Sequence, residues 1–114
     1  MAPPSGDGTV QRMVDFIDRG YADRITLKTV AASVRGNPAK LGRSFRAKMG
    51  VSVHVYVTQV RLEHAADLIS SNIKVEAVAL GVGYRSKKNF YRQFARHFGV
   101  TPEAFRKKQK LGRR

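Results

Sequence analysis

Apolar residues near the start of the chain recur every three or four positions, which is the spacing of one face of an α-helix. This first set comprises Val10, Met13, Val14, Ile17 and Tyr21. Thr9 is a possible N-cap before the set and Gly20 lies near its end, and both residue types favour helix ends. The pattern predicts an amphipathic first helix.

Two shorter helices are predicted next, on either side of a glycine-containing turn. Thr26 can cap the first of them, whose apolar face is Leu27, Val30, Ala31 and Val34. Arg35-Gly36 then breaks the chain, and Asn37-Pro38 restarts it as a cap followed by proline at the first helical position. Gly50 ends this next helix, whose inner stripe is Leu41, Phe45 and Met49. Two short helices about a tight turn, the second rich in exposed basic residues, are typical of a helix-turn-helix.

Segment 51–58 alternates strictly between apolar and other residues, which taken alone predicts a β-strand. A lone strand in an otherwise helical chain would have no pairing partner. From a Ser52 cap onward, helical spacing also holds for Tyr56, Val57, Val60, His64, Ala65, Leu68 and Ile69. We therefore predict a linker helix over 53–71, roughly 28 Å long at 1.5 Å per residue.

The chain contains one unit twice. Segment 43–52 returns as 92–101, so that Arg92 follows Arg43 by 49 positions. The helical apolar positions of the second copy are Val75, Val78, Ala79, Val82, Phe90, Phe94 and Phe98. Two copies are too few for a solenoid, so we expect a pair of binding modules that contact one repetitive partner twice.

Caps and stops also recur in the second copy. Ser86 can cap its second helix and Gly99 can end it. Thr101-Pro102 starts a last short helix that is predicted to run through Phe105. The residues from Arg106 onward form a basic end that is expected to fray.

These elements predict an all-α chain with two helix-turn-helix subdomains joined by a long helix. The expected parts are a flexible tail (1–8), a first subdomain (9–52), the linker helix (53–71), a second subdomain (72–108) and a basic tail (109–114). The first eight residues do not resemble a targeting segment, and no apolar run of about 18 residues could span a membrane. We expect a soluble, cytoplasmic protein.

The net charge of +14 lies entirely in the duplicated part. Residues 1–34 hold four basic and four acidic side chains, whereas residues 35–114 hold 18 basic and four acidic ones. Such a surface attracts polyanions, nucleic acid first and anionic membrane second. Charge that serves only solubility is the plainer alternative.

The face that the apolar stripes leave outward on each second helix is basic. In the first unit these positions are Ala39, Lys40, Gly42, Arg43, Arg46 and Ala47. In the second they are Lys87, Lys88, Asn89, Tyr91, Arg92 and Arg96. A charged stripe is most often a solvated helix face, but the repetition of Arg43 as Arg92 in register favours a contact surface.

Gly42 needs a reason of its own, because glycine inside a helix costs about 1 kcal/mol relative to alanine. Close approach of the backbone to DNA is one explanation. Tolerance of a weak residue on an exposed face is the other, and the sequence leaves both open.

Metal, cofactor and catalytic sites are not predicted. His54, His64 and His97 share no helical face with a carboxylate, and the chain has no cysteine to complete a zinc site. Gly81-Val82-Gly83 lacks the remaining glycine of a dinucleotide fingerprint. No nucleophile has an obvious base beside it, so we expect neither an enzyme nor a bound cofactor.

Segment 79–106 carries the most specific pattern, and it resembles the signature of the AraC/XylS-type bacterial transcription regulators. The matching residues are Gly83, Tyr84, Ser86, Phe90, Arg92, Phe94, Phe98, Gly99, Val100, Thr101, Pro102, Phe105 and Arg106. Residues similar to the linker helix of that family are Arg61, Ala65, Leu68 and Ile69. The resemblance covers nearly everything from Val10 to Lys107.

The resemblance implies transcriptional control by a homeodomain-like, AraC-type domain whose two recognition helices enter successive major-groove segments of duplex DNA. The positions it assigns to base contact are Ala39, Gly42, Arg43, Lys87, Lys88, Tyr91 and Arg92. Candidates for phosphate contact are Lys40, Arg46, Ser86, Asn89 and Arg96. Ala39 and Gly42 are smaller than the residues such regulators often have there, so the first unit is expected to read sequence weakly.

The resemblance also implies partners. They are double-stranded DNA, RNA polymerase, and the separate sensor or dimerisation domain that most members carry. The sequence leaves two alternatives open, a compact stand-alone regulator or the C-terminal DNA-binding portion of a longer protein. Arg61 is expected to hold the linker helix through an internal ion pair rather than to contact DNA. An RNA-binding or ribosome-associated protein is the alternative from another class, although few aromatic residues face outward to stack on bases. A basic peripheral membrane protein is a further alternative. It is disfavoured because the apolar stripes are buried in the two cores and leave no apolar face for a membrane.

Overall fold

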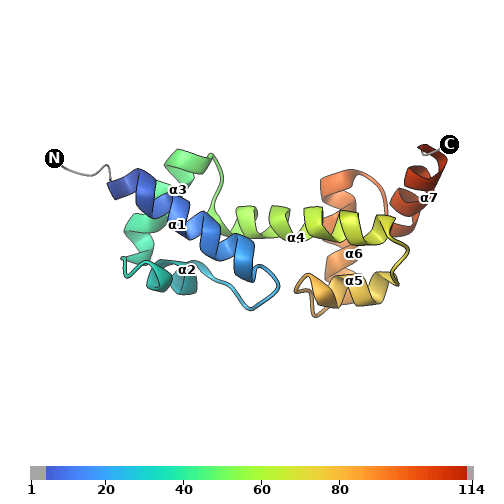
Figure 1. Ribbon diagram of the computed structural model, residues 1–114, viewed down its shortest axis with the longest axis horizontal. Coiled ribbons are helices and arrows are strands. Elements are labelled where there is room, and N and C mark those ends of the chain that lie inside the picture. Colours follow the sequence, from blue (N-terminus) through green and yellow to red (C-terminus); the bar gives the residue numbers. More distant parts are fainter. Residues whose placement is uncertain (1–4, 113–114) are drawn as a thin grey trace. The chain divides into compact units, whose positions relative to one another are not determined.

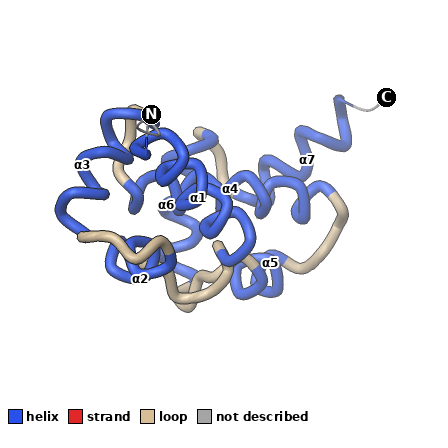
Figure 2. Tube along the Cα trace, turned by 60° about the vertical axis from the view of Figure 1, so that its left-hand side comes forward, coloured by secondary structure: helices blue, strands red, loops and turns tan. Residues whose placement is uncertain are grey.

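The structure, a computed structural model, describes residues 5–112 and is helical, with no strand within that range (Figure 2). The helices are α1 (Ser5–Gly20), α2 (Leu27–Ser33), α3 (Pro38–Met49), α4 (Val53–Ser70), α5 (Val75–Gly81), α6 (Lys87–Phe98) and α7 (Pro102–Gly112). The prediction of an all-α chain is confirmed. Among the described residues, no helix is long and apolar enough to cross a membrane.

The chain forms two compact units, Met1–Thr58 and Gln59–Arg114, and the division falls inside α4. The helix predicted over 53–71 is therefore present, but its residues belong to two cores. Val53 and Val57 are buried in the first unit, and Leu62 and Ile69 in the second. Each half of α4 is thus part of a unit and not merely a connection.

In the first unit, α1, α2 and α3 pack against one another (Figure 1). Met13 and Ile17 of α1, Val30 of α2 and Phe45 of α3 are fully buried, because the apolar stripes of the three helices converge on one core. Burial of these stripes fixes which face of α3 remains outside.

The predicted caps of α2 and α3 are confirmed. Thr26 and Thr29 form a capping box at the start of α2. The Asn37 side chain accepts a hydrogen bond from the Lys40 backbone N–H at 2.9 Å. Gly50 ends α3 in the left-handed conformation, with φ of 81°. Local capping chemistry therefore sets the length and direction of α3.

Segment 51–58 starts α4 rather than forming a strand. The Ser52 hydroxyl accepts a hydrogen bond from the Val55 N–H at 3.2 Å, which is the predicted cap. The Tyr56 ring packs edge-on to Phe45 at 5.7 Å and its hydroxyl donates to Asp18 at 3.1 Å. The helical prediction is confirmed because the first turn of α4 completes the core of the first unit.

The second unit repeats these devices. Ser86 accepts a hydrogen bond from the Asn89 N–H at 3.1 Å at the start of α6, and Gly99 ends that helix with φ of 79°. Phe94 and Phe105 pack edge-on at 5.5 Å, exactly one repeat after Phe45 and Tyr56. Sequence repetition has produced repeated packing.

Two predicted boundaries are wrong. Helix α1 begins at Ser5, so Thr9 lies inside it and residues 5–8 are helical rather than a tail; residues 1–4 lie outside the described part. Helix α7 continues past Phe105 to Gly112, and residues 113–114 lie outside the described part. Adding a residue to an existing helix is much easier than nucleating one, so helices extend beyond their apolar stripes.

Candidate nucleic-acid interface

The outward face of α3 consists of small and basic residues. Ala39, Lys40, Arg43 and Arg46 are all exposed, as is Ala47. The Asn37 cap and Pro38 set where the helix begins. The buried Phe45 holds the opposite side of the helix in the core. No acidic residue lies in the first turn of α3. The first unit therefore offers a cationic helix face of the kind that enters a DNA groove.

Gly42 lies at the contact between α2 and α3. A Cβ added to Gly42 would stand 3.0 Å from Cδ2 of Leu27, and the residue is half-buried. The absence of a side chain thus allows the two helices to approach each other closely. This is a third explanation for the glycine, and it requires the position of Leu27, which sequence spacing did not reveal.

The outward face of α6 is more strongly basic. Lys87, Lys88, Arg92 and Arg96 are exposed, whereas Tyr91 and Asn89 are half-buried. Ser86 is exposed as well, but its hydroxyl oxygen is occupied by the cap. Because Phe90 and Phe94 hold the other side of α6 in the core, Lys88, Arg92 and Arg96, which are spaced four residues apart, share one outward face of the helix.

Four of the α6 side chains have partners that order them. Arg92 Nη2 donates to Asn89 Oδ1 at 3.1 Å. Lys87 Nζ donates to Glu76 of α5 at 3.0 Å, and the same ammonium lies 5.7 Å from the centre of the Tyr91 ring. The Tyr91 hydroxyl in turn donates to Glu103 of α7.

The electrostatics of this cluster follow from those contacts. The hydrogen bond from Lys87 holds the pKa of Glu76 below its usual value, since it favours the carboxylate. Burial, together with the hydrogen bond to Glu103, raises the pKa of Tyr91 to about 12. At neutral pH, therefore, Tyr91 is a neutral phenol between an ammonium and a carboxylate.

Two other arginines of the second unit serve the fold. The Arg61 guanidinium lies 6.0 Å from the centre of the Tyr84 ring, and burial lowers its pKa. Arg106 Nε donates to the carbonyl of Ile69 at 2.8 Å and its Nη2 donates to that of Ile73, which satisfies the end of α4. Neither belongs to the exposed face of α6.

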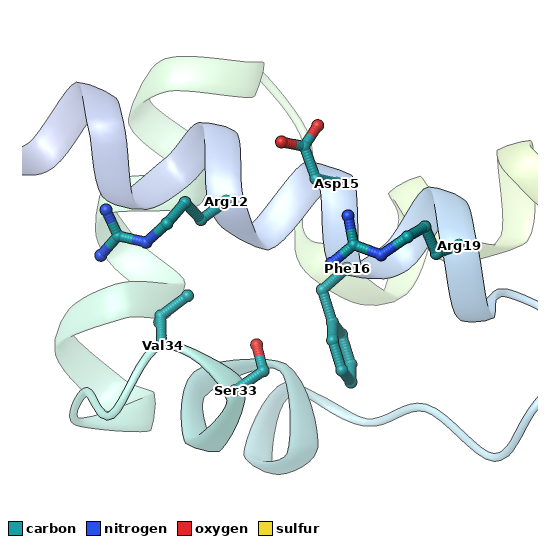
Figure 3. A pocket seen from close by; sticks show the side chains of 6 residues that line it. All are labelled: Arg12, Asp15, Phe16, Arg19, Ser33 and Val34. Atoms are coloured by element: carbon teal, nitrogen blue, oxygen red, sulfur yellow. The ribbon is translucent and has the colours of Figure 1, made fainter.

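A groove of about 300 Å³ lies between α1 and α2 of the first unit (Figure 3). Phe16 points toward α2, and Phe16, Arg12 and Arg19 of α1 form part of the lining of the groove. Asp15 points away from α2 in the same view. The lining carries both signs of charge and includes no residue of α3, so it is separate from the basic helix face.

Sequence reasoning missed the partners of three α6 side chains: Asn89 for Arg92, Glu76 for Lys87 and Glu103 for Tyr91. The pair Asn89 and Arg92 is spaced i, i+3 on one helix and was open to prediction. Glu76 and Glu103 come from other helices, so no periodic pattern reveals them. Within the described residues, no group of three histidines or acids could hold a metal ion.

A protein-family model described as "Helix-turn-helix domain" matches residues 30–108 of this chain. The lactose operon transcription activator of Staphylococcus xylosus is 32% identical over 98 residues, which are 85% of this chain and 35% of that protein.

This chain belongs to the AraC-type helix-turn-helix family. Among solved structures, it is similar to the C-terminal domain of AraT, a response regulator from Geobacillus stearothermophilus. That match has a TM-score of 0.85 at 28% identity and covers 88% of this chain and 84% of the other.

The DNA-binding domain of AdpA has the same fold, with a TM-score of 0.86 at 23% identity over 92% of this chain and 96% of that one. The AraC-type chain is thus a helix-turn-helix DNA-binding domain of the kind found in transcription regulators. It spans about a third of the length of the curated relatives it matches.

Proposed function

We propose that this chain binds duplex DNA sequence-specifically and regulates transcription in bacteria, with α3 and α6 as its recognition helices. The main support for this function is that a capped helix with a basic outward face occurs twice, at an interval of 49 residues. The solved AdpA domain, which shares the fold, is described in complex with a target DNA.

The side chains fall into two proposed roles. Arg43 and Arg92 suit bidentate contact to guanine, and Lys87 and Lys88 can donate to guanine or phosphate. The Ala39 methyl group suits apolar contact with a thymine methyl. Tyr91 on α6 and Gly42 on α3 are the remaining base-contact candidates.

Phosphate contacts are proposed for the other outward residues. Lys40, Arg46 and Arg96 would neutralise phosphates and release counterions, a large and salt-dependent part of the affinity. Ser86 and Asn89 lie at the start of α6, where a hydroxyl and an amide can also reach the DNA backbone.

We also propose that the two helices enter successive major-groove segments of one duplex. Such segments lie about 34 Å apart on B-DNA. Five base pairs inserted between the two halves of the bound site would turn one half to the opposite side of the duplex. We expect that insertion to lower affinity to the level of a single half-site, and unchanged affinity would remove this arrangement.

The cellular location and the partners of the protein are part of the same proposal. A regulator of this kind acts on chromosomal DNA in the cytoplasm, without catalysis of its own. RNA polymerase is a proposed partner, because the matched relative is named as a transcription activator. A sensor or dimerisation domain is a second proposed partner, because that relative is far longer than this chain.

The experiment that tests the function is selection of bound duplexes from a random library. The winning duplex is then titrated against a scrambled duplex and a structured RNA at two salt concentrations. We expect an enriched motif and tighter binding to it than to either competitor at both salts. No enrichment, with affinity that simply falls as salt rises, would leave a non-specific polyanion binder. Preference for the RNA would favour the RNA-binding alternative.

A further inference from the structure

Two acidic side chains lie against the basic face of α6, at a place where negative charge opposes DNA binding. Residues 35–114 contain only four acidic residues. Of these, Glu76 accepts a hydrogen bond from Lys87, and Glu103 accepts one from Tyr91. A carboxylate in this position repels phosphate, so its presence calls for a compensating role.

The first unit has the same fold without these contacts. At the interval of 49, Pro38 corresponds to Lys87, Gly42 to Tyr91 and His54 to Glu103. The second turn has one extra residue, so before the turn the interval is 48 and Lys28 corresponds to Glu76. None of the four residues is kept, yet α2 and α3 form the same kind of helix pair as α5 and α6, with a side-chain cap at the start of both α3 and α6. The network is therefore not what makes a helix-turn-helix unit fold, and its role concerns the surface that α6 presents.

The chemistry of Tyr91 shows what this role is. An ionised carboxylate has no proton to give, so the phenol must be the donor in its hydrogen bond to Glu103. The phenol oxygen is then left with lone pairs alone. It cannot donate to a phosphate oxygen, to O6 or N7 of guanine, or to O4 of thymine, all of which are acceptors.

We propose that Glu103 is a positioning residue that makes Tyr91 an acceptor-only reader of the exocyclic amino group of adenine or cytosine in the major groove. Glu76 assists by holding the Lys87 ammonium 5.7 Å from the centre of the Tyr91 ring. This inference rests on the proposed function of α6 as a recognition helix. It assigns a chemical preference to one base pair of the bound site.

The test compares Glu103→Gln with native protein on duplexes in which each base pair of the selected site is varied in turn. A glutamine amide can either donate to the phenol oxygen or accept from it, so Tyr91 is no longer restricted to accepting. We expect one position to lose its preference for a base with an amino group by about three- to tenfold, the range of a single hydrogen bond. Discrimination at the position read by Arg92 stays as in the native protein.

Matched variants separate this role from charge and from folding. Glu63→Gln removes the same charge at an exposed site on α4 and is expected to tighten binding to all duplexes without changing base preference. Tyr91→Phe is expected to relax the same position as Glu103→Gln, and the double variant to relax it no further. If Glu103→Gln does not fold, Tyr91→Phe alone tests whether the Tyr91 hydroxyl sets the base preference at that position.

The outcomes are distinct. If Glu103→Gln and Tyr91→Phe shift every duplex equally, as Glu63→Gln does, the positioning role is wrong while the DNA-binding function stands. If the relaxed position prefers guanine or thymine on the strand that α6 contacts, the acceptor assignment is wrong. If the native chain enriches no motif at all, it is the proposed function that fails.

Discussion

The two proposed recognition helices, α3 and α6, share one architecture and differ in how their surfaces are ordered. Both begin with a polar cap, present a basic face and end at a glycine with positive φ. In α6, however, Lys87, Tyr91 and Arg92 are each held by another side chain. Among the described residues, no side-chain hydrogen bond or ion pair is seen for Arg43 at the corresponding place in α3.

This difference shows that the repeat preserves the core and leaves the outward face free to diverge. Phe45 and Phe94 occupy the same place and are both fully buried. Gly42 and Tyr91 also occupy the same place, but one permits helix packing and the other takes part in a polar network. Ordered side chains lose less entropy on binding, so α6 is expected to discriminate bases more strongly than α3.

The largest effects are expected from the two cores. Phe45→Ala and Phe94→Ala should each lower the free energy of unfolding of their own unit by about 3 to 5 kcal/mol, because each leaves a cavity. Amide hydrogen exchange, followed residue by residue, measures this. Phe45→Ala should reduce protection in α1–α3 and Phe94→Ala in α5–α7. Equal loss of protection throughout the chain after either change would contradict two separately stabilised units.

The next effect concerns the arginines of the recognition helices. Arg92→Ala should weaken binding to the selected site by about 1 to 3 kcal/mol and binding to scrambled DNA far less. Arg96→Ala should weaken both alike and reduce the salt dependence, as expected for a phosphate contact. Fluorescence anisotropy titrations of both duplexes measure this. Equal losses on the two duplexes for Arg92→Ala would remove it from the base readers.

The turns of the two units have different residues at the position with positive φ. Arg35 has φ of 56° and its counterpart Gly83 has φ of 106°, a region where side chains are disfavoured. Gly83→Ala should destabilise the second unit by about 1 to 2 kcal/mol, and Arg35→Gly should stabilise the first by up to about 1 kcal/mol. Denaturant titrations give both values. Stabilisation by Gly83→Ala would show that the turn is not constrained as described.

The smallest effect is a pH dependence that only the second unit should show. The pKa of Tyr91 is raised from about 10 to about 12, so the folded state favours the neutral phenol. This contribution to stability is present below about pH 10 and is lost as pH rises from about 10 to about 12. Denaturation of native protein and Tyr91→Phe across that window should show the difference in stability shrinking. A constant difference would contradict the burial and the contact with Glu103.

The sequence was sufficient for most of the fold because the deciding signals are local. Thr26, Asn37 and Ser86 act as caps within their own turns, and apolar spacing identified the buried faces. The start of α1 and the end of α7 were misjudged because helix propagation beyond an apolar stripe leaves no marked signal.

The candidate site was less predictable, for a related reason. The basic faces follow directly from helical spacing, whereas the contacts that order them join different helices. Lys87 and Glu76 are 11 residues apart across a turn, and Tyr91 and Glu103 are 12 apart. The close contact of Gly42 with Leu27 likewise depends on how α2 and α3 pack. Such pairings follow from tertiary structure and have no periodic signature.

The most direct test of the central claim is to repeat the duplex selection with Arg43→Ala and with Arg92→Ala and compare the enriched motifs with that of the native chain. The account predicts a motif in two halves, with each variant relaxing a different half and Arg92→Ala causing the larger loss of information. A single continuous motif that both variants relax at the same positions would contradict it.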